Sequence, residues 1–191
     1  MEIINLKIDE PIEAIQGGVV VALGFFDGIH LAHMELINKV ISIGKETSLK
    51  TGLVTFHPHP AFILNKSDIT TFLTPLEVKA NILAKIDIDY LFIVHFDHET
   101  ALLDHKAFVE TYLLPLNVNT VVAGYDNRYG LGGKGSIRTI ENDSNGKIKP
   151  IEIEEKSYKG QKIGSTLIRR LLENGDVSEV SELLGRPYSL D

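Results

Sequence analysis

The stretch VVVALGFFDGIHLAH, residues 19–33, decides the fold of this chain. Its first five residues, Val19–Leu23, are all apolar, and a glycine stands on each side of them. A short unbroken apolar run between glycines is typical of a strand buried in a parallel sheet. After the GFFDG turn, apolar residues recur at helical spacing from position 31 to position 41. The stretch therefore predicts a buried strand, a tight turn and a long helix.

The same alternation of strand and helix continues along the chain. Apolar runs predict further strands at residues 51–56, 90–95 and 118–123, and a fifth, expected at an edge of the sheet, at 148–154. Helices are predicted between them, from a Thr74-Pro75-Leu76-Glu77 capping box to residue 86 and from Asp104 to residue 114, and two short ones follow at 165–175 and 176–185. Strands that alternate with helices predict an α/β fold, with a parallel sheet covered by helices on both faces.

Composition sets limits on what the protein binds. The chain has 191 residues, 43% of them hydrophobic and 24% charged, which suits one globular domain. Its formal charge of -7 argues against broad nucleic-acid or membrane-surface binding. There is no cysteine, so disulfides, thiolate nucleophiles and cysteine-ligated metals are excluded. Since no apolar run approaches the ~20 residues of a membrane helix, a cytoplasmic protein is the default expectation.

Three chemically loaded loops follow three of the predicted strands. They are GFFDGIH at residues 24–30, HPHPAF at 57–62 and GYDNRYG at 124–130. In open parallel sheets, ligands bind beyond the carboxyl ends of the strands. We therefore expect the three loops to meet at one site.

The first loop has the parts of a phosphate cradle. His30 and His33 are three residues apart at the start of the predicted helix, which places both rings on one face. The helix N-terminus adds free amides and a partial positive charge, and Gly24 and Gly28 allow a ligand to approach the backbone. Asp27, in the same turn, is expected either to cap the helix or to help place a metal ion.

A second anion-binding candidate lies near the end of the chain. Ser165 and Thr166 open a predicted helix, and Arg169 follows one turn later with a forked donor suited to phosphate oxygens. The same pattern describes an ordinary helix cap with a surface arginine. The anion-binding interpretation therefore depends on whether this helix packs beside the first one.

The other two loops suit an aromatic ligand. Phe56 and Phe62 flank the proline-stiffened HPHP segment, and Asp126 and Asn127 offer acceptors and donors to the edge of a heterocycle. His57 and His59 have no evident third partner, so we expect no protein-ligated metal there.

Together these segments resemble a known family. GFFDGIHLAH, TFHPHP, GYDNRYG and IGSTLIRRLLENGDVSEVSELLGRPYSL are similar, in order and spacing, to the motifs of the bacterial FAD synthetase family of nucleotidyltransferases. The chain departs from the family pattern at five positions. Phe25 replaces the usual asparagine, Ala32 glycine, His57 glutamate, Asn127 phenylalanine and Gly164 serine.

The resemblance implies a Rossmann-like nucleotidyltransferase. It would transfer the adenylyl group of ATP to FMN, giving FAD and pyrophosphate, with Mg²⁺ bound to ATP. Residues 1–191 would form a single FMN adenylyltransferase domain, without the riboflavin kinase domain that often follows. Two alternatives stay open: a weakened flavin- or nucleotide-binding regulator, and an adenylyl- or cytidylyltransferase with a different phosphorylated acceptor.

The resemblance also implies roles for individual residues. His30, His33 and Arg169 would be catalytic. The ATP-binding set would be Gly24, Phe25, Phe26, Asp27, Gly28, His30, His33, Ser165, Thr166 and Arg169. The flavin-binding set would be Phe56, Pro58, Phe62, Asp126 and Asn127. The partners would be the small molecules ATP and FMN, with neither nucleic acid nor membrane.

Overall fold

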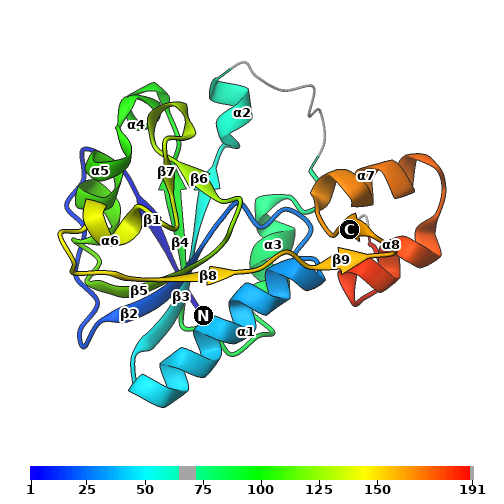
Figure 1. Ribbon diagram of the computed structural model, residues 1–191, viewed down its shortest axis with the longest axis horizontal. Coiled ribbons are helices and arrows are strands. Elements are labelled where there is room, and N and C mark those ends of the chain that lie inside the picture. Colours follow the sequence, from blue (N-terminus) through cyan, green and yellow to red (C-terminus); the bar gives the residue numbers. More distant parts are fainter. Residues whose placement is uncertain (65–71, 190–191) are drawn as a thin grey trace.

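The apolar run Val19–Leu23 forms strand β2 inside a six-stranded sheet in the computed structural model, which describes residues 1–64 and 72–189 (Figure 1). The strand order is β1-β4-β3-β2-β5-β8, and every neighbouring pair is parallel. Helices cover both faces of the sheet (Figure 1). The predicted α/β fold is thus confirmed.

The elements follow the predicted alternation closely. In chain order they are β1 (Glu2–Leu6), β2 (Val19–Leu23), α1 (Leu31–Thr47), β3 (Lys50–His57), α2 (Pro60–Ile63), α3 (Leu76–Leu83), β4 (Tyr90–His95), α4 (His98–Leu102), α5 (His105–Phe108), the π-helix η1 (Val109–Leu113), β5 (Val118–Gly124), β6 (Arg128–Tyr129), the 3-10 helix η2 (Leu131–Gly133), β7 (Gly135–Ser136), α6 (Ile140–Asp143), β8 (Lys149–Ile153), β9 (Ser157–Tyr158), β10 (Gln161–Lys162), α7 (Ser165–Glu173) and α8 (Val177–Leu184).

Strand β2 supplies side chains to two separate cores. Val19, Val21 and Leu23 pack on the face covered by α5, η1 and α6, while Val20 and Ala22 pack on the face covered by α1 and α3. All five side chains are fully buried. Because burying one valine or leucine side chain stabilises a fold by about 1.5–3 kcal/mol, an unbroken apolar run is what this position requires.

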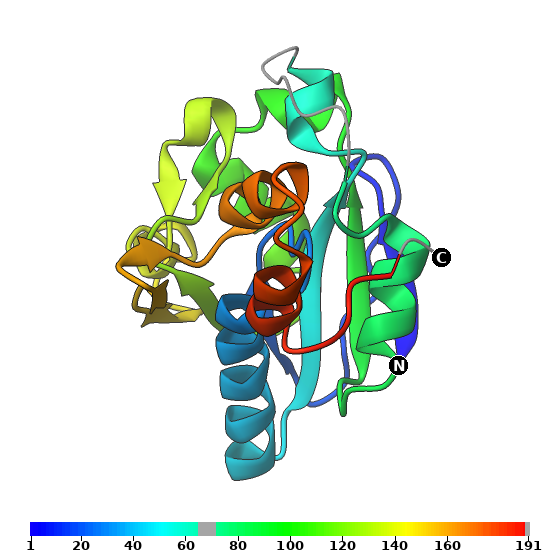
Figure 2. The same ribbon diagram turned by 90° about the vertical axis from the view of Figure 1, so that its right-hand side faces the viewer.

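The two C-terminal helices form a third apolar cluster. Ile168 and Leu171 of α7 pack with Val180 and Leu183 of α8, and Leu31 at the start of α1 packs against them. Figure 2 shows α7 and α8 beside the upper end of α1. The N-terminus of α7 is thereby brought to the turn that precedes α1. The helix that carries Ser165 and Arg169 therefore packs beside α1, as the anion-binding interpretation of these residues requires.

The structure corrects several sequence-based expectations. Residues 2–6 form the edge strand β1, which pairs with β4 and was not predicted, because its sequence EIINL is short, carries polar residues and is mostly exposed. The capping box is wrong: Pro75 is the N-cap of α3, without a side-chain cap, and Thr74 bonds elsewhere. Helix α3 ends at Leu83, before the predicted position 86. Strand β8 is at an edge and Asp104 caps α5, both as predicted.

No helix within the described residues is long and apolar enough to cross a membrane.

Gly44 lets α1 pack closely on β3, which gives a test of the fold. A Cβ atom at Gly44 would lie 2.3 Å from Thr51 Cγ2 and 3.2 Å from the Leu49 carbonyl oxygen. We expect Gly44→Ala to lower the free energy of unfolding by about 1–3 kcal/mol, although alanine is the better helix former. Urea unfolding measures the change.

Two further variants control for this effect. Adding Thr51→Ser to Gly44→Ala removes the methyl group that clashes and should recover part of the stability. Asn38→Ala, at an exposed position of the same helix, should leave stability equal or slightly higher. If Gly44→Ala is as stable as the original chain, the close packing of α1 on β3 is wrong.

Candidate functional site

One cavity opens where the order of the strands reverses. From β2 the chain builds the sheet toward β1 with β3 and β4, then crosses to the other side of β2 with β5 and β8. The crevice beyond the carboxyl ends of β2 and β5 holds a cavity of about 710 Å³. It brings together residues 23–27 and 124–128 of the two strand ends, residues 30–36 of the turn and α1, and residues 161–170 leading into α7. The three predicted loops therefore meet at this edge: the loops after the first and the fourth predicted strands supply most of the lining, and the loop after the second supplies His59.

The turn between β2 and α1 has an unusual backbone conformation. Phe26 has φ 56° and Ile29 has φ 41°, a region that side-chain-bearing residues rarely occupy, and Gly28 has φ 90°. The side chains of Phe26 and Ile29 are fully buried in the core beside α1. Their burial holds the strained backbone in place. Phe26, predicted to bind ATP, thus offers the cavity its backbone and a ring that packs against His33.

The carbonyl groups of this turn are bonded to side chains from distant segments. The Phe25 carbonyl oxygen accepts from Lys79 Nζ at 2.6 Å and from Thr55 Oγ1 at 3.0 Å. The Asp27 carbonyl accepts from Ser165 Oγ at 2.8 Å. The carbonyls of residues 28 and 29 accept from the Arg186 guanidinium at 2.7 and 2.9 Å. Every carbonyl named here is held by a donor from outside the turn.

The amide groups of the turn are less occupied. The N–H of Gly28 donates to Thr74 Oγ1 at 2.8 Å, which is why Thr74 does not cap α3. The N–H groups of Phe26 and Asp27 have no acceptor among the described residues. Both residues line the cavity. The turn can therefore offer donors to an anion, as a phosphate cradle requires.

His30 and His33 form a stacked, uncharged pair. Their ring centroids are 3.6 Å apart, and the planes are inclined by 16°. His30 Nδ1 accepts the N–H of His33 at 3.3 Å, so His30, and not Asp27, caps α1. Burial lowers the pKa of His30 to about 4, and burial also lowers the pKa of His33 well below its usual range. With Nδ1 of His30 acting as an acceptor, its proton at neutral pH is on Nε2.

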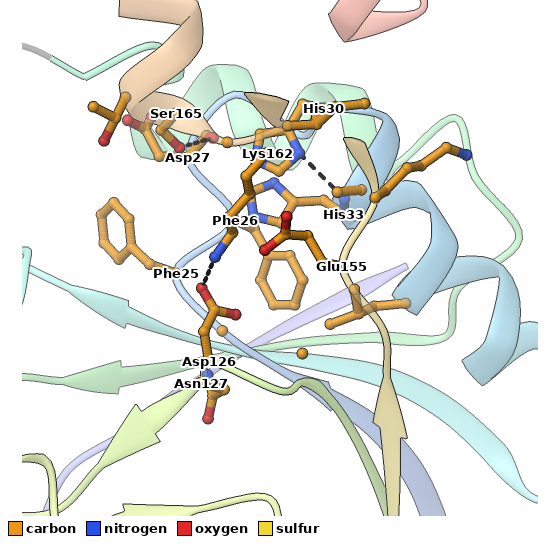
Figure 3. Close-up of a pocket in the computed structure, with 18 of the residues that line it drawn as sticks. Phe25, Phe26, Asp27, His30, His33, Asp126, Asn127, Glu155, Lys162 and Ser165 are labelled. Carbon is orange, nitrogen blue, oxygen red and sulfur yellow. Dashed lines mark hydrogen bonds and ion pairs between the residues drawn. The ribbon is translucent and has the colours of Figure 1, made fainter. Parts of the chain in front are cut away.

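Asp27 and Arg169 join the two predicted anion sites. The Arg169 guanidinium forms an ion pair with the Asp27 carboxylate, which also accepts the N–H of Thr74 at 3.0 Å. Asp27 is buried, so a charged partner is needed to offset its desolvation. Ser165, the first residue of α7, and Thr166 line the same cavity (Figure 3). The ATP-binding residues predicted from the two motifs therefore face one another, apart from Gly28, which lies behind the lining.

The predicted flavin residues are divided by the structure. Asp126 and Asn127 line the cavity. The Asn127 side-chain amide donates to the Leu23 carbonyl at 3.2 Å and so ties the loop after β5 to the end of β2. Phe56, Pro58 and Phe62 do not line this cavity: Phe56 packs against Phe96 and Phe108 on the opposite core, and Phe62 is 44% exposed on α2. Their flavin-binding role stays a prediction.

An aromatic cluster lies beside the cavity instead. The Phe25 ring packs edge-on against His59, with centroids 4.0 Å apart, and against Phe72 at 5.8 Å. Phe25 and His59 also line the cavity. The phenylalanine that replaces the usual asparagine therefore bridges the turn and the HPHP loop.

Three exposed ion pairs connect segment 156–162, beside the cavity, to the rest of the molecule, and sequence reasoning missed them. Lys162 of β10 is paired with Asp126 across the opening (Figure 3). Lys156 is paired with Glu35 of α1, and Lys159 with Glu179 of α8. Segment 156–162 is thus connected to three different parts of the molecule. The partners in these pairs are far apart in the sequence and come together only in the folded chain, so no spacing in the sequence indicates them.

Lys79 was also missed. Its side chain is 2% exposed, and its ammonium lies under the turn. The signal was a lysine on the apolar face of a short helix, where a charge is normally absent.

The acidic and imidazole groups do not form a metal cage. Within the described residues, no group of three or more histidine, aspartate or glutamate side chains is placed to hold a metal ion.

Comparisons with known proteins found a matching family, similar sequences and a similar solved structure. Residues 12–167 match the FAD synthetase family. The chain is 39% identical over 174 residues to the bifunctional riboflavin kinase/FMN adenylyltransferase of Bacillus subtilis, covering 91% of this chain and 55% of that protein. It is 31% identical over 175 residues to the FAD synthetase of Listeria monocytogenes, covering 88% and 69%.

The chain spans about half the length of the bifunctional relatives it matches, with 55% and 54% covered in Bacillus subtilis and Listeria monocytogenes. Among solved structures, a macrolide-efflux protein from Streptococcus pneumoniae is similar with a TM-score of 0.84 and 28% identity, covering 98% of this chain and 72% of that one. The match covers the sheet and the helices on both of its faces.

The lowered pKa of His30 makes the site sensitive to acid. The unfolded chain binds a proton at His30 below about pH 6.5, whereas the folded chain does so only below about pH 4, so stability falls as pH decreases between these values. At pH 5, His30 should remove roughly 2 kcal/mol of the stability present at pH 7.5. His30→Asn keeps a cap acceptor without a titrating ring.

The measurement is urea unfolding at pH 7.5 and pH 5. The variant should lose roughly 2 kcal/mol less than the original chain between the two values. His33 is present in both proteins, and the main cause of its lowered pKa, burial, is the same in both. Equal losses in both proteins would contradict the buried, uncharged state of His30.

Proposed function

Since this chain belongs to the FAD synthetase family, we propose that it transfers the adenylyl group of ATP to FMN, with FAD and pyrophosphate as products. The observation that supports the proposal is the meeting, at one cavity, of the two segments that the sequence predicts to bind phosphate. The turn with His30 and the start of α7 are linked there by the ion pair of Asp27 and Arg169. A triphosphate needs donors on more than one side, and this arrangement supplies them.

In this proposal, a phosphate oxygen of FMN attacks the α-phosphorus of ATP in line. A new P–O bond forms, the bond from the α-phosphorus to the oxygen bridging the β-phosphate breaks, and pyrophosphate leaves. Such transfers depend on positioning and on charge stabilisation more than on covalent help from the protein. Mg²⁺ would enter with ATP as part of the substrate, because phosphate oxygens and water can supply its ligands.

The uncharged histidines would act as donors and not as cations. His30 carries its proton on Nε2, and donors placed in a site with little water stabilise oxygens that gain charge in the transition state. Positive charge would come from Arg169 and from the N-terminus of α7. Asp126 and Asn127, at the other wall, would contact the flavin, provided that the Lys162 ion pair rearranges.

The same proposal includes the partners and the location. The partners are ATP and FMN, without nucleic acid or membrane, and the protein acts in the cytoplasm.

The direct test is an assay with MgATP and FMN. We expect FAD and pyrophosphate in equal amounts. Replacing FMN by pantetheine phosphate, or ATP by CTP, should give no nucleotidyl product. Tight flavin binding without FAD would point to a regulator, and a product from another acceptor would refute FMN as the substrate.

Variants of the histidines test the chemistry. We expect His30→Ala and His33→Ala each to reduce kcat by tenfold or more, because one well-placed transition-state donor is worth ~3 kcal/mol. His98→Ala, at an exposed position on α4, is the matched control and should keep full activity. A folded double variant of His30 and His33 that makes FAD at the original rate would rule out the proposed mechanism.

A further inference from the structure

Lys79 is a buried cation whose partners are all uncharged. Its Nζ donates to the Phe25 carbonyl oxygen at 2.6 Å and to Thr55 Oγ1 at 3.2 Å. It also lies 4.3 Å from the centroid of the Phe25 ring. Burying an ammonium is costly unless its hydrogen bonds are satisfied, so this cation needs a structural or functional reason.

The carbonyl that Lys79 holds fixes the direction of one peptide plane. In a trans peptide unit, the carbonyl of one residue and the N–H of the next point in opposite directions. Lys79 and Thr55, both buried, draw the Phe25 carbonyl into the interior. The N–H of Phe26 in the same peptide unit must therefore point away from Lys79, and it has no acceptor among the described residues. Phe26 lines the cavity.

We propose that Lys79 is a positioning residue that orients the peptide between Phe25 and Phe26, so that the N–H of Phe26 donates to a phosphate group in the cavity. The inference rests on the proposed function for the identity of that phosphate as part of ATP. Lys79 does not line the cavity, so its effect passes through the peptide and through its positive charge.

The charge of Lys79 changes near neutral pH. Burial lowers the pKa of Lys79 to about 8, and the Asp27 carboxylate opposes this shift. His33 and His59 also face it, and burial lowers the pKa of both rings, so both are uncharged above pH 7. Lys79 is therefore charged below about pH 8 and loses its charge as the pH rises through that value. The hydrogen bond from Lys79 to the Phe25 carbonyl oxygen should weaken over the same pH range.

The experiment compares Lys79→Met, Lys79→Gln and the control Lys85→Met. Lys85 lies exposed just beyond the same helix, so its variant loses the same charge without touching the turn. Magnesium pyrophosphate is the binding probe, measured by calorimetry at pH 7 and pH 9.5. KM values for ATP and FMN are measured in parallel at pH 7.

A hydrogen bond to a charged group is worth enough to change affinity by tenfold or more. Lys79→Met should bind pyrophosphate at least about tenfold more weakly at pH 7, and its difference from the original chain should close by pH 9.5. Its KM for ATP should rise while its KM for FMN stays constant, whereas general damage to the fold would raise both. Lys79→Gln keeps an N–H donor, so its pyrophosphate affinity should lie between those of Lys79→Met and the original chain. Lys85→Met should bind pyrophosphate as tightly as the original chain.

A folded Lys79→Met with unchanged pyrophosphate affinity at pH 7 would overturn the proposal. Should neither Lys79 variant fold, the amide ¹⁵N shift of Phe26 in the original chain is followed from pH 6.5 to pH 10. A step near pH 8 supports the role of Lys79, and a constant shift overturns it. Pyrophosphate binding without any FAD synthesis would count against the proposed function alone, because the binding comparison stays valid.

Discussion

Four carbonyl groups of the turn between β2 and α1, those of residues 25, 27, 28 and 29, are hydrogen-bonded to side chains from outside the turn, and the rest of the site depends on this constraint. Their donors come from β3, α3, α7 and the segment after α8, which are far apart in the sequence. A turn that kept its carbonyls toward the cavity would repel phosphate. The whole fold is therefore needed to make one short loop attractive to an anion.

Two features of the fold, the parallel sheet and the third apolar cluster, hold these donors in place. The parallel sheet brings the ends of β2 and β5 to one edge, where the strand order reverses. The third apolar cluster then fixes α7 and α8 against the start of α1. The ion pair of Asp27 and Arg169 spans the two parts, and because Asp27 is buried its loss would leave an uncompensated charge. Packing and electrostatics thus act on the same few residues.

Much of this could be predicted from the sequence, and the reasons differ by residue. The buried strand Val19–Leu23 was evident because an apolar run between glycines has few other interpretations. The resemblance to the FAD synthetase family, carried by four motifs in order, is confirmed by the family match. Thr74 was misassigned because a capping pattern is a local signal, and a distant amide, that of Gly28, competed for its hydroxyl. The lysines of segment 156–162 depend on long-range contacts, which no local pattern encodes. For Lys79 the sequence shows a charge on the apolar face of a short helix, and only the fold shows its distant partner, the Phe25 carbonyl.

Two parts of the site differ in what holds them. The turn between β2 and α1 is fixed by buried side chains, whereas exposed lysine–carboxylate pairs connect segment 156–162 to α1, α8 and the loop after β5. Exposed pairs are weak and are screened within about 8 Å at physiological ionic strength, whereas buried contacts are screened much less. Rising salt should therefore weaken the connections of segment 156–162 more than the buried contacts of the turn between β2 and α1. The entrance of the cavity therefore depends on the ionic strength of the solvent more than the turn at its base does.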